Sequence, residues 1–207
     1  MKKFENKKVW FTSDLHFKHK NIIKYCERPF ESVDEMTEVL IDIWNKIVAK
    51  EDVVFILGDF CFGGYTRWEE ILKQLNGEIH LILGNHDPEK IANKLLENGY
   101  LKSISSMELI EVDGQELFLC HFPMIDWPNK ERGSIMLHGH IHSMYNDIDL
   151  SEKHYDVGID HNDYEPVCLS EIYNSLKNYK KPRTTFKQVL QTIGKYFKEL
   201  YNNWCVS

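Results

Sequence analysis

Residues 78–87 read EIHLILGNHD, and in this segment a mostly apolar run leads directly into a polar cluster. The run 78–83 is short and apolar enough to predict a buried strand. Gly84 ends the run, and Asp87-Pro88 opens a helix that we expect to end near Asn98-Gly99. A strand, a polar turn and a helix in this order predict one unit of a layered α/β fold.

The same order of elements recurs toward the N-terminus. Residues 8–13 and 52–57 are two further apolar runs that predict strands. Ser32 and Thr66 each stand three residues before a glutamate, and this capping-box pattern predicts a helix start at each. The first hundred residues therefore alternate strand and helix, which indicates an α/β fold with parallel strands.

The pattern changes after residue 100. Residues 104–112 and 116–121 flank Asp113-Gly114, a pair typical of a tight hairpin, so we expect these two strands to be antiparallel. Further strands are expected at 134–137 and 155–158. These elements complete a body that we place at residues 1–179.

Residues 180–207 differ from the body and are expected to form a C-terminal amphipathic helical extension. The segment 180–183, KKPR, reads as a linker. The helix is expected to pack on the body or on a second copy of the chain, giving a homodimer; a membrane surface or nucleic acid is the alternative partner. Its apolar stripe at helical spacing consists of Phe186, Val189, Leu190, Ile193, Phe197, Leu200, Tyr201 and Trp204.

Composition and charge limit the class of protein. The chain has 207 residues, 43% of them hydrophobic, which suits one globular domain with a buried core. Its net charge of −7 disfavours long nucleic acid as a partner. The five cysteines are scattered without C-x-x-C spacing, which argues against a disulfide framework and a thiolate zinc site. We find neither a long apolar run nor a signal-like N-terminus, and expect a cytoplasmic protein without a transmembrane segment.

Side chains that bind metals follow five of the expected strands. In layered α/β folds, ligand sites form at the carboxyl ends of the strands. Glycine precedes three of these clusters, which lets the backbone approach a ligand closely. The clusters are Asp14-Leu15-His16, Gly58-Asp59, Gly84-Asn85-His86-Asp87, Cys120-His121 and Gly139-His140-Ile141-His142.

The donor atoms of these clusters favour transition metals. Carboxylate oxygen and imidazole nitrogen together suit Mn, Fe, Zn or Ni better than Mg or Ca. Asp59 follows a central strand, and because a carboxylate can bridge two ions, it is the natural bridge of a two-metal site. His140 and His142 would point to opposite sides of an extended segment, so each could serve one ion. Two ions about 3.5–4 Å apart would acidify a shared water and clamp phosphate oxygens.

These blocks resemble the calcineurin-like metallophosphoesterase superfamily. Its motifs D-x-H, G-D, G-N-H-[DE], H and G-H-x-H all occur here in order, between Asp14 and His142. The resemblance implies a sandwich of two mixed β-sheets flanked by helices. It also implies hydrolysis of phosphate esters by a hydroxide that bridges two metal ions, with Mn favoured. Arg28-Pro29-Phe30 and residues 158–162 are similar to small bacterial and phage members.

The resemblance implies a role for each motif residue. Asp59 would bridge the two ions. His86 would bind no metal and would stabilise or protonate the leaving oxygen, and Asp87 would orient His86. The first metal would be held by Asp14, His16 and His142, and the second by Asn85, His121 and His140.

Three residues outside the motifs are candidates for substrate binding. Arg28 can offer a bidentate contact to an oxyanion, with a structural salt bridge as the alternative. His19 follows the first motif and could reach a bound phosphate. His161 lies in the segment 158–162 and is a similar candidate.

Three kinds of function fit these residues. We expect a phosphodiesterase that acts on a small molecule or a nucleotide. The alternatives are a nuclease acting on DNA or RNA and a phosphomonoesterase. A binding scaffold without catalysis is disfavoured, because every ligand position of the motifs is filled.

Overall fold

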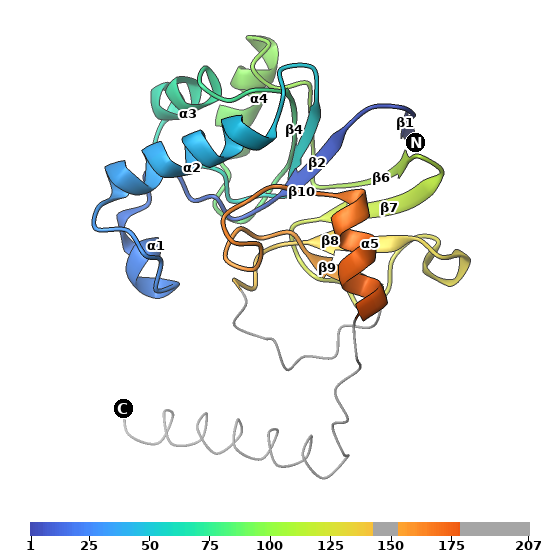
Figure 1. Ribbon diagram of the computed structural model, residues 1–207. Helices are drawn as coiled ribbons and strands as arrows, with labels where there is room; N and C mark the ends of the chain where they lie inside the picture. The colour runs from blue at the N-terminus through green and yellow to red at the C-terminus, as the bar shows by residue number, and fades with distance from the viewer. Residues whose placement is uncertain (143–152, 179–207) are drawn as a thin grey trace, which may run out of the picture.

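The structure is a computed structural model that describes residues 1–142 and 153–178, and its two five-stranded sheets lie face to face (Figure 1). In spatial order, the first sheet consists of β10 (Val167–Cys168), β2 (Val9–Thr12), β3 (Val53–Ile56), β4 (Glu78–Ile82) and β5 (Ser103–Ser105). The second sheet consists of β1 (Lys2–Phe4), β6 (Met107–Val112), β7 (Gln115–Cys120), β8 (Ile135–His138) and β9 (His154–Asp156). Both sheets mix parallel and antiparallel pairs, which confirms the predicted sandwich.

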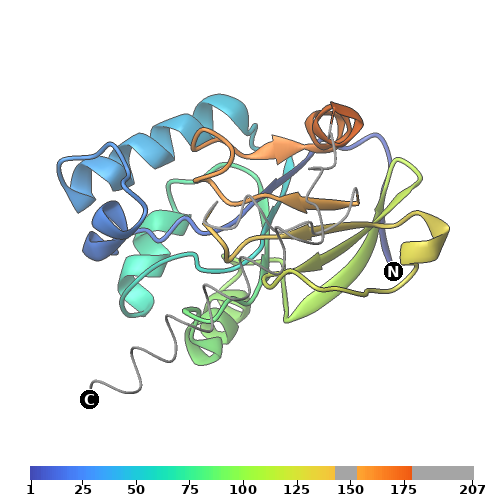
Figure 2. The same ribbon diagram turned by 90° about the horizontal axis from the view of Figure 1, so that it is seen from below.

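Helices cover the outer side of the first sheet. They are α1 (Lys20–Tyr25), α2 (Val33–Ile47), α3 (Tyr65–Leu72) and α4 (Glu89–Glu97). Figure 2 shows these helices on the left and the strands β6 and β7 of the second sheet on the right. A short 3-10 helix spans Lys130–Arg132, and α5 (Leu169–Asn178) packs beside β9 and β10.

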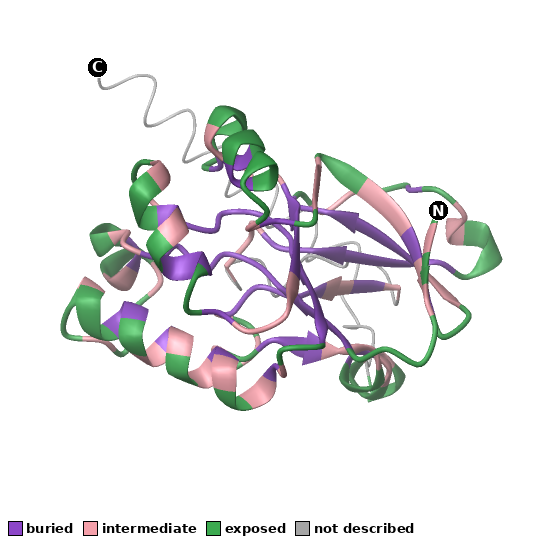
Figure 3. Ribbon diagram, turned by 90° about the horizontal axis from the view of Figure 1, so that it is seen from above, coloured by how far each residue is buried: buried purple, intermediate pink, exposed green. Residues whose placement is uncertain are grey.

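Side-chain alternation along the strands of the first sheet supplies two separate cores. Trp10, Val54 and Ile56 pack with the helices, whereas Phe11 and Phe55 pack between the two sheets. The central strands are therefore buried on both faces, and the exposed residues of the helices point outward (Figure 3). This double burial explains why these strands read as continuous apolar runs in the sequence.

Several predicted boundaries agree with the structure. The Ser32 hydroxyl accepts a 3.1 Å hydrogen bond from the amide of Glu35, so Ser32 caps α2. The helix α4 ends just before Asn98, as expected. β6 and β7 are antiparallel around Asp113 and Gly114, whose φ angles of 47° and 83° are those of a tight hairpin turn.

Other predictions were wrong in detail. Thr66 lies inside α3, whose N-cap is Gly64, because the chain turns into the helix directly after Gly63 at φ 118°. The strand predicted over 104–112 is two strands, since β5 pairs with β4 of the first sheet and β6 pairs with β7 of the second. The elements β1, β10 and α1 were not predicted, because each is too short to show a period. The helix α5, with ten residues and an amphipathic pattern, was missed although its sequence carried the signal.

The predicted C-terminal helix at 180–207 and the boundary that precedes it lie outside the described residues. Among the helices that the structure describes, none is both long and apolar enough to cross a membrane.

Candidate metal centre

The predicted polar clusters meet at one edge of the sandwich, where the loops after β2, β3 and β4 face the loops after β7 and β8. The imidazole Nδ1 of His121, at the end of β7, lies 2.7 Å from the carbonyl oxygen of Leu57, at the end of β3. The amide of Asp14 donates a 3.0 Å hydrogen bond to the carbonyl of Gly58, and that of His16 donates one of 2.9 Å to the carbonyl of Asp59. These bonds hold the exit loops of both sheets together.

A first group of donor atoms comes from Asp14, His16 and His142, whose candidate ligand atoms all lie within 4.8 Å of one another. The Nε2 atoms of His16 and His142 are 3.3 Å apart, and Nε2 of His142 lies 3.6 Å from Oδ1 of Asp14. Ligand atoms about 2.0–2.2 Å from one ion lie about 2.8–3.6 Å from each other along an edge of its coordination shell. The spacing of this group therefore fits a single ion.

A second group forms around His121. Its Nε2 lies 2.9 Å from Oδ1 of Asn85, and the ring of His140 lies 5.1 Å from the ring of His121. Asp14, Asp59 and His121 also bring ligand atoms within 4.8 Å of one another.

Asp59 lies between the two groups. Its Oδ2 is 3.5 Å from Nε2 of His16 and 3.6 Å from Nε2 of His121. Oδ2 thus lies 3.5 Å and 3.6 Å from one candidate ligand atom of each group, a spacing at which one carboxylate could bridge two ions.

The protonation pattern of the imidazoles favours a cation at this site. Nδ1 of His121 faces the carbonyl of Leu57 and donates its proton there, so Nε2 is the nitrogen that faces the oxygens of Asn85 and Asp59 and could bind a metal. The buried Oδ1 of Asp14 has no hydrogen-bond donor among the described residues. A buried carboxylate oxygen without a donor is stabilised by a positive charge beside it, and a metal ion would supply that charge.

Burial acts on the ionisation of the same groups. Burial raises the pKa of Asp14 to about 6, although His142 and His121 oppose the change. Burial, reinforced by His142 and Arg28, lowers the pKa of His16, so its imidazole is neutral and free to bind a metal. A bound cation would stabilise the ionised carboxylate of Asp14, which burial disfavours.

The backbone at several candidate ligands has the left-handed conformation. Asp14, His16, Asp59, His140 and His142 have φ angles of 59°, 48°, 55°, 73° and 46°. Non-glycine residues rarely adopt such angles, and they cluster at functional sites. The segment that carries His140 and His142 is therefore a turn, so the condition of an extended segment is not met. The two histidines still join different groups, His140 with His121 and His142 with His16.

All three predicted glycines are required by close packing, and a Cβ on Gly58 would collide with Nδ1 of His121. A Cβ on Gly84 would collide with Oδ1 of Asp59, and a Cβ on Gly139 would collide with the side chains of Ser13 and Asp14. The glycines thus let the loops approach the carboxylates, as the sequence predicted.

Arg28 was a candidate for binding phosphate, but in the structure its guanidinium donates hydrogen bonds to other groups of the protein. Its Nε and Nη2 each donate a 2.8 Å hydrogen bond to the carboxylate of Asp160, and Nη2 and Nη1 also donate to the carbonyls of Asp14 and Leu15. The residue is 3% exposed. The salt-bridge alternative is therefore the one that the structure supports.

The sequence did not single out Asp160, which extends this network to His142. Its Oδ2 lies 2.7 Å from Nδ1 of His142; although burial opposes the change, this hydrogen bond raises the pKa of His142 to about 10, and it would keep the proton on Nδ1 when Nε2 binds a metal. A signal was present, because Asp160 follows a strand and Gly158 as the other candidate ligands follow theirs. His161, the candidate from this segment, is exposed, and its ring lies 6.0 Å from that of Tyr155.

Asp87 also has partners that differ from those expected. Its Oδ2 accepts hydrogen bonds of 2.8 Å and 2.9 Å from the amides of Asp59 and Gly84, and its Oδ1 accepts one of 2.9 Å from the amide of Phe60. The carboxylate thus ties the loop after β3 to the loop after β4. It positions the backbone of Asp59, and no hydrogen bond to the His86 ring is described for it.

His86 and His19 lie at the exposed side of the first group. The ring of His86 is 5.7 Å from that of His16 and 6.5 Å from that of His19. His86 is exposed, with its amide bonded to Oδ1 of Asp59 at 2.9 Å. Both histidines can therefore reach a ligand bound at the first group.

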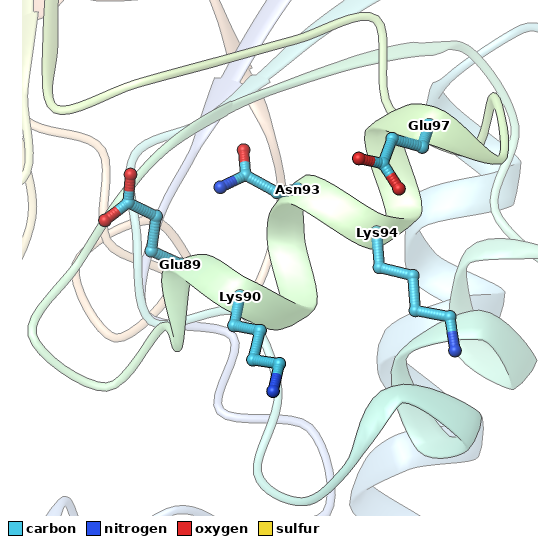
Figure 4. Close-up of a pocket in the computed structure, with 5 residues that line it drawn as sticks. All are labelled: Glu89, Lys90, Asn93, Lys94 and Glu97. Atoms are coloured by element: carbon cyan, nitrogen blue, oxygen red, sulfur yellow. The ribbon is translucent and has the colours of Figure 1, made fainter.

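A shallow hollow lies along the exposed face of α4, and its lining residues differ from those of the two ligand groups. Figure 4 shows that acidic, basic and amide side chains line it. Long surface side chains of this kind are usually solvated, and none of the candidate ligands belongs to the hollow. Its lining residues are Glu89, Lys90, Asn93, Lys94 and Glu97.

A two-sheet α/β sandwich with aspartate, histidine and asparagine side chains gathered at its strand ends is the fold of the metallophosphoesterases. The chain belongs to the calcineurin-like phosphoesterase family, whose sequence profile matches residues 7–196. This is a family of phosphoesterases that typically bind divalent metals, and the buried Asp/His groups described above are positioned for a metal.

Three other proteins are similar to this chain. An uncharacterized protein of Methanocaldococcus jannaschii is 36% identical over 184 residues, which cover 86% of this chain and 96% of that protein. A probable cyclic nucleotide phosphodiesterase of Coxiella burnetii is 26% identical over 151 residues, covering 70% of this chain and 51% of that protein. The crystal structure of a protein of unknown function from Aquifex aeolicus superposes with a TM-score of 0.64 at 27% identity, covering 82% of this chain and 100% of that one.

Proposed function

We propose that this chain is a phosphodiesterase with a dinuclear metal centre in which Asp59 bridges the two ions. The observation that carries the proposal is the position of Asp59 Oδ2, 3.5 Å from Nε2 of His16 and 3.6 Å from Nε2 of His121. The first ion would be held by Asp14, His16 and His142, and the second by Asn85, His121 and His140.

The donor set limits the choice of metal. Two carboxylates, four imidazoles and one amide oxygen, without a thiolate, suit Mn, Fe, Zn or Ni, and we favour Mn. When bound, the two ions would withdraw charge from the phosphate oxygens and make a water molecule acidic enough to attack at neutral pH.

His86 is proposed as the catalytic residue that is not a ligand. Hydrolysis forms a bond from a water oxygen to phosphorus and breaks the bond from phosphorus to the leaving oxygen, which departs as an alcohol after it gains a proton. In this proposal the exposed imidazole of His86, whose ring lies 5.7 Å from that of His16, would give that proton. His19, whose ring lies 6.5 Å from that of His86, is proposed to contact the substrate.

We propose a small diester, including nucleotide diesters, as the substrate. The family supports phosphate-ester hydrolysis, and the Coxiella burnetii relative supports a diester. A nuclease activity on DNA or RNA and a phosphomonoesterase activity are the alternatives, and the net charge of −7 disfavours the first.

A substrate screen tests this proposal. The metal-free chain, reloaded with Mn²⁺, Ni²⁺ or Mg²⁺, is assayed with bis(4-nitrophenyl) phosphate, 4-nitrophenyl phosphate, the 2′,3′- and 3′,5′-cyclic nucleotides and a plasmid. We expect Mn²⁺-dependent hydrolysis of the diesters in preference to the monoester. Faster hydrolysis of the monoester, or cleavage of the plasmid alone, would contradict the proposal.

A further inference from the structure

Aromatic side chains lie beside both ligand groups, and the roles proposed above leave most of them unused. Beside the first group, the ring of Phe62 stacks on that of His19 with centroids 3.7 Å apart, and it lies 5.2 Å from the ring of His86. Tyr25 extends this surface, because its ring is 6.4 Å from that of His19 and the residue is 65% exposed. Phe62, His19 and Tyr25 together are called the Phe62 rim below.

Phe122 lies beside the second group. Its ring is 4.6 Å from that of His140 and 5.0 Å from that of His121. The residue is 44% exposed, whereas Phe11 and Phe55 in the core are fully buried. Scattered exposed apolar residues are common on protein surfaces, but this one directly contacts two candidate metal ligands.

We infer that the two aromatic surfaces bind the two organic groups of a phosphodiester that carries planar aromatic groups. The Phe62 rim would contact the group that leaves, and Phe122 would contact the group that remains on phosphorus. This inference rests on the proposed phosphodiesterase function and names the class of its substrate.

The assignment of sides follows from His86. Because His86 is proposed to protonate the leaving oxygen and its ring lies against Phe62, the departing group must pass along the Phe62 rim. Phe122 has ring contacts with His121 and His140, and none with His86 is described within the resolved part of the chain. A monoester has a single organic group and would leave one of the two surfaces uncovered. Aromatic surfaces favour planar groups, which they can contact by stacking or edge to face.

Two diesters with the same leaving group separate the two surfaces. Bis(4-nitrophenyl) phosphate and methyl 4-nitrophenyl phosphate both release 4-nitrophenolate, and they differ in the group that remains on phosphorus. The measured quantity is the ratio of kcat/KM for the first diester to kcat/KM for the second, with the Mn²⁺-loaded full chain. Phe122→Leu keeps an apolar side chain against His140 but removes the planar face.

We expect Phe122→Leu to lower this ratio about 3- to 10-fold relative to the wild type, the size of a lost aromatic contact. Phe62→Leu should lower kcat/KM for both diesters by a similar factor, because their leaving group is the same. Ile125→Ala is the matched control, since Ile125 lies in the same loop as Phe122 and is 90% exposed. Its ratio should equal that of the wild type, and metal content and Tm are measured for every variant.

The outcomes distinguish this inference from the proposed function. If the wild type hydrolyses the diesters and Phe122→Leu leaves the ratio unchanged, the inference is overturned and the phosphodiesterase proposal stands. An equal fall of the ratio in Ile125→Ala would overturn it too. If the metal-loaded wild type hydrolyses neither diester, the phosphodiesterase proposal fails and the inference fails with it.

Discussion

The Nε2 atoms of His16 and His142 lie 3.3 Å apart, although 126 residues separate the two histidines in the chain. The fold makes this pair by placing the loop after β2 beside the loop after β8. Burial lowers the pKa of His16, whereas the hydrogen bond to Asp160 raises that of His142 against the effect of burial, so a single proton can join the two Nε2 atoms. A metal ion bound by both nitrogens would take the place of that proton.

The role of His86 predicts how its removal depends on the leaving group. His86→Ala should keep both metals and slow the hydrolysis of a diester with an alkyl leaving group about 10²–10⁴-fold. Bis(4-nitrophenyl) phosphate should be less affected, because 4-nitrophenolate departs without a proton. Metal analysis and kcat on both substrates check this, with His161→Ala as a control at an exposed histidine. Loss of the metals in His86→Ala would make His86 a ligand and contradict the assignment.

The contacts of Asp87 predict a structural effect of its substitution. In the wild type the carboxylate of Asp87 accepts hydrogen bonds from backbone amides. In Asp87→Asn an NH₂ group faces some of these amides and leaves them unpaired, which should lower the free energy of unfolding by about 1–3 kcal/mol. Metal occupancy should fall as well, because the backbone of Asp59 loses its anchor. Thermal unfolding and metal content are measured, with the exposed Glu89→Gln as control. An unchanged Tm with a low kcat would instead mean that Asp87 acts through His86.

The network of Arg28 and Asp160 predicts a change in metal affinity. Asp160→Asn removes the charge that holds the proton on Nδ1 of His142. We expect this variant to bind Mn²⁺ about 10- to 100-fold more weakly than the wild type, the usual effect of losing such a partner of a metal ligand. The measurement is a Mn²⁺ titration of the metal-free protein, with the exposed Asp163→Asn as the control. Equal affinities in the two variants would remove Asp160 from the metal site.

His80, outside the metal site, predicts an acid-dependent loss of stability. Burial, with a smaller contribution from Lys2, lowers the pKa of His80 to about 4, whereas an unfolded histidine has a pKa of about 6.5. The unfolded state therefore binds a proton that the native state lacks between these values, so the free energy of unfolding falls as the pH falls through this window. Chemical denaturation at pH 7 and pH 5 should show a smaller loss in His80→Asn than in the wild type. A loss as large as that of the wild type would contradict this account.

The sequence was sufficient for the strands that lead to the site and for the identity of the candidate ligands. Residues 53–56 are buried on both faces, and this leaves a continuous apolar run that ends visibly at Gly58. The candidate ligands are aspartate, asparagine and histidine residues, and five clusters of such residues directly after apolar strands seldom occur by chance.

The roles of Arg28, Asp87 and Asp160 could not be read in the same way. Each depends on partners from other loops: Arg28 is 132 residues from Asp160, and Asp87 bonds amides 27 and 28 residues away. The sequence shows which groups could ionise or donate, but the pairs exist only after the sheets bring the loops together. Phe122 directly follows His121 in the sequence, but its ring contact with His140 and that of Phe62 with His86 join separate loops and appear only in the fold.

The central claim, a metal pair bridged by Asp59, is tested most directly by loading the metal-free wild type and Asp59→Asn with Mn²⁺ and recording bound Mn²⁺ per chain together with the EPR spectrum. For the wild type we predict two ions per chain and the spectrum of an exchange-coupled pair. For Asp59→Asn we predict loss of the coupled spectrum and of most bound metal, because the amide cannot supply the bridging charge. One ion per chain with the spectrum of isolated Mn²⁺ in the wild type, or an unchanged coupled pair in Asp59→Asn, would contradict the account.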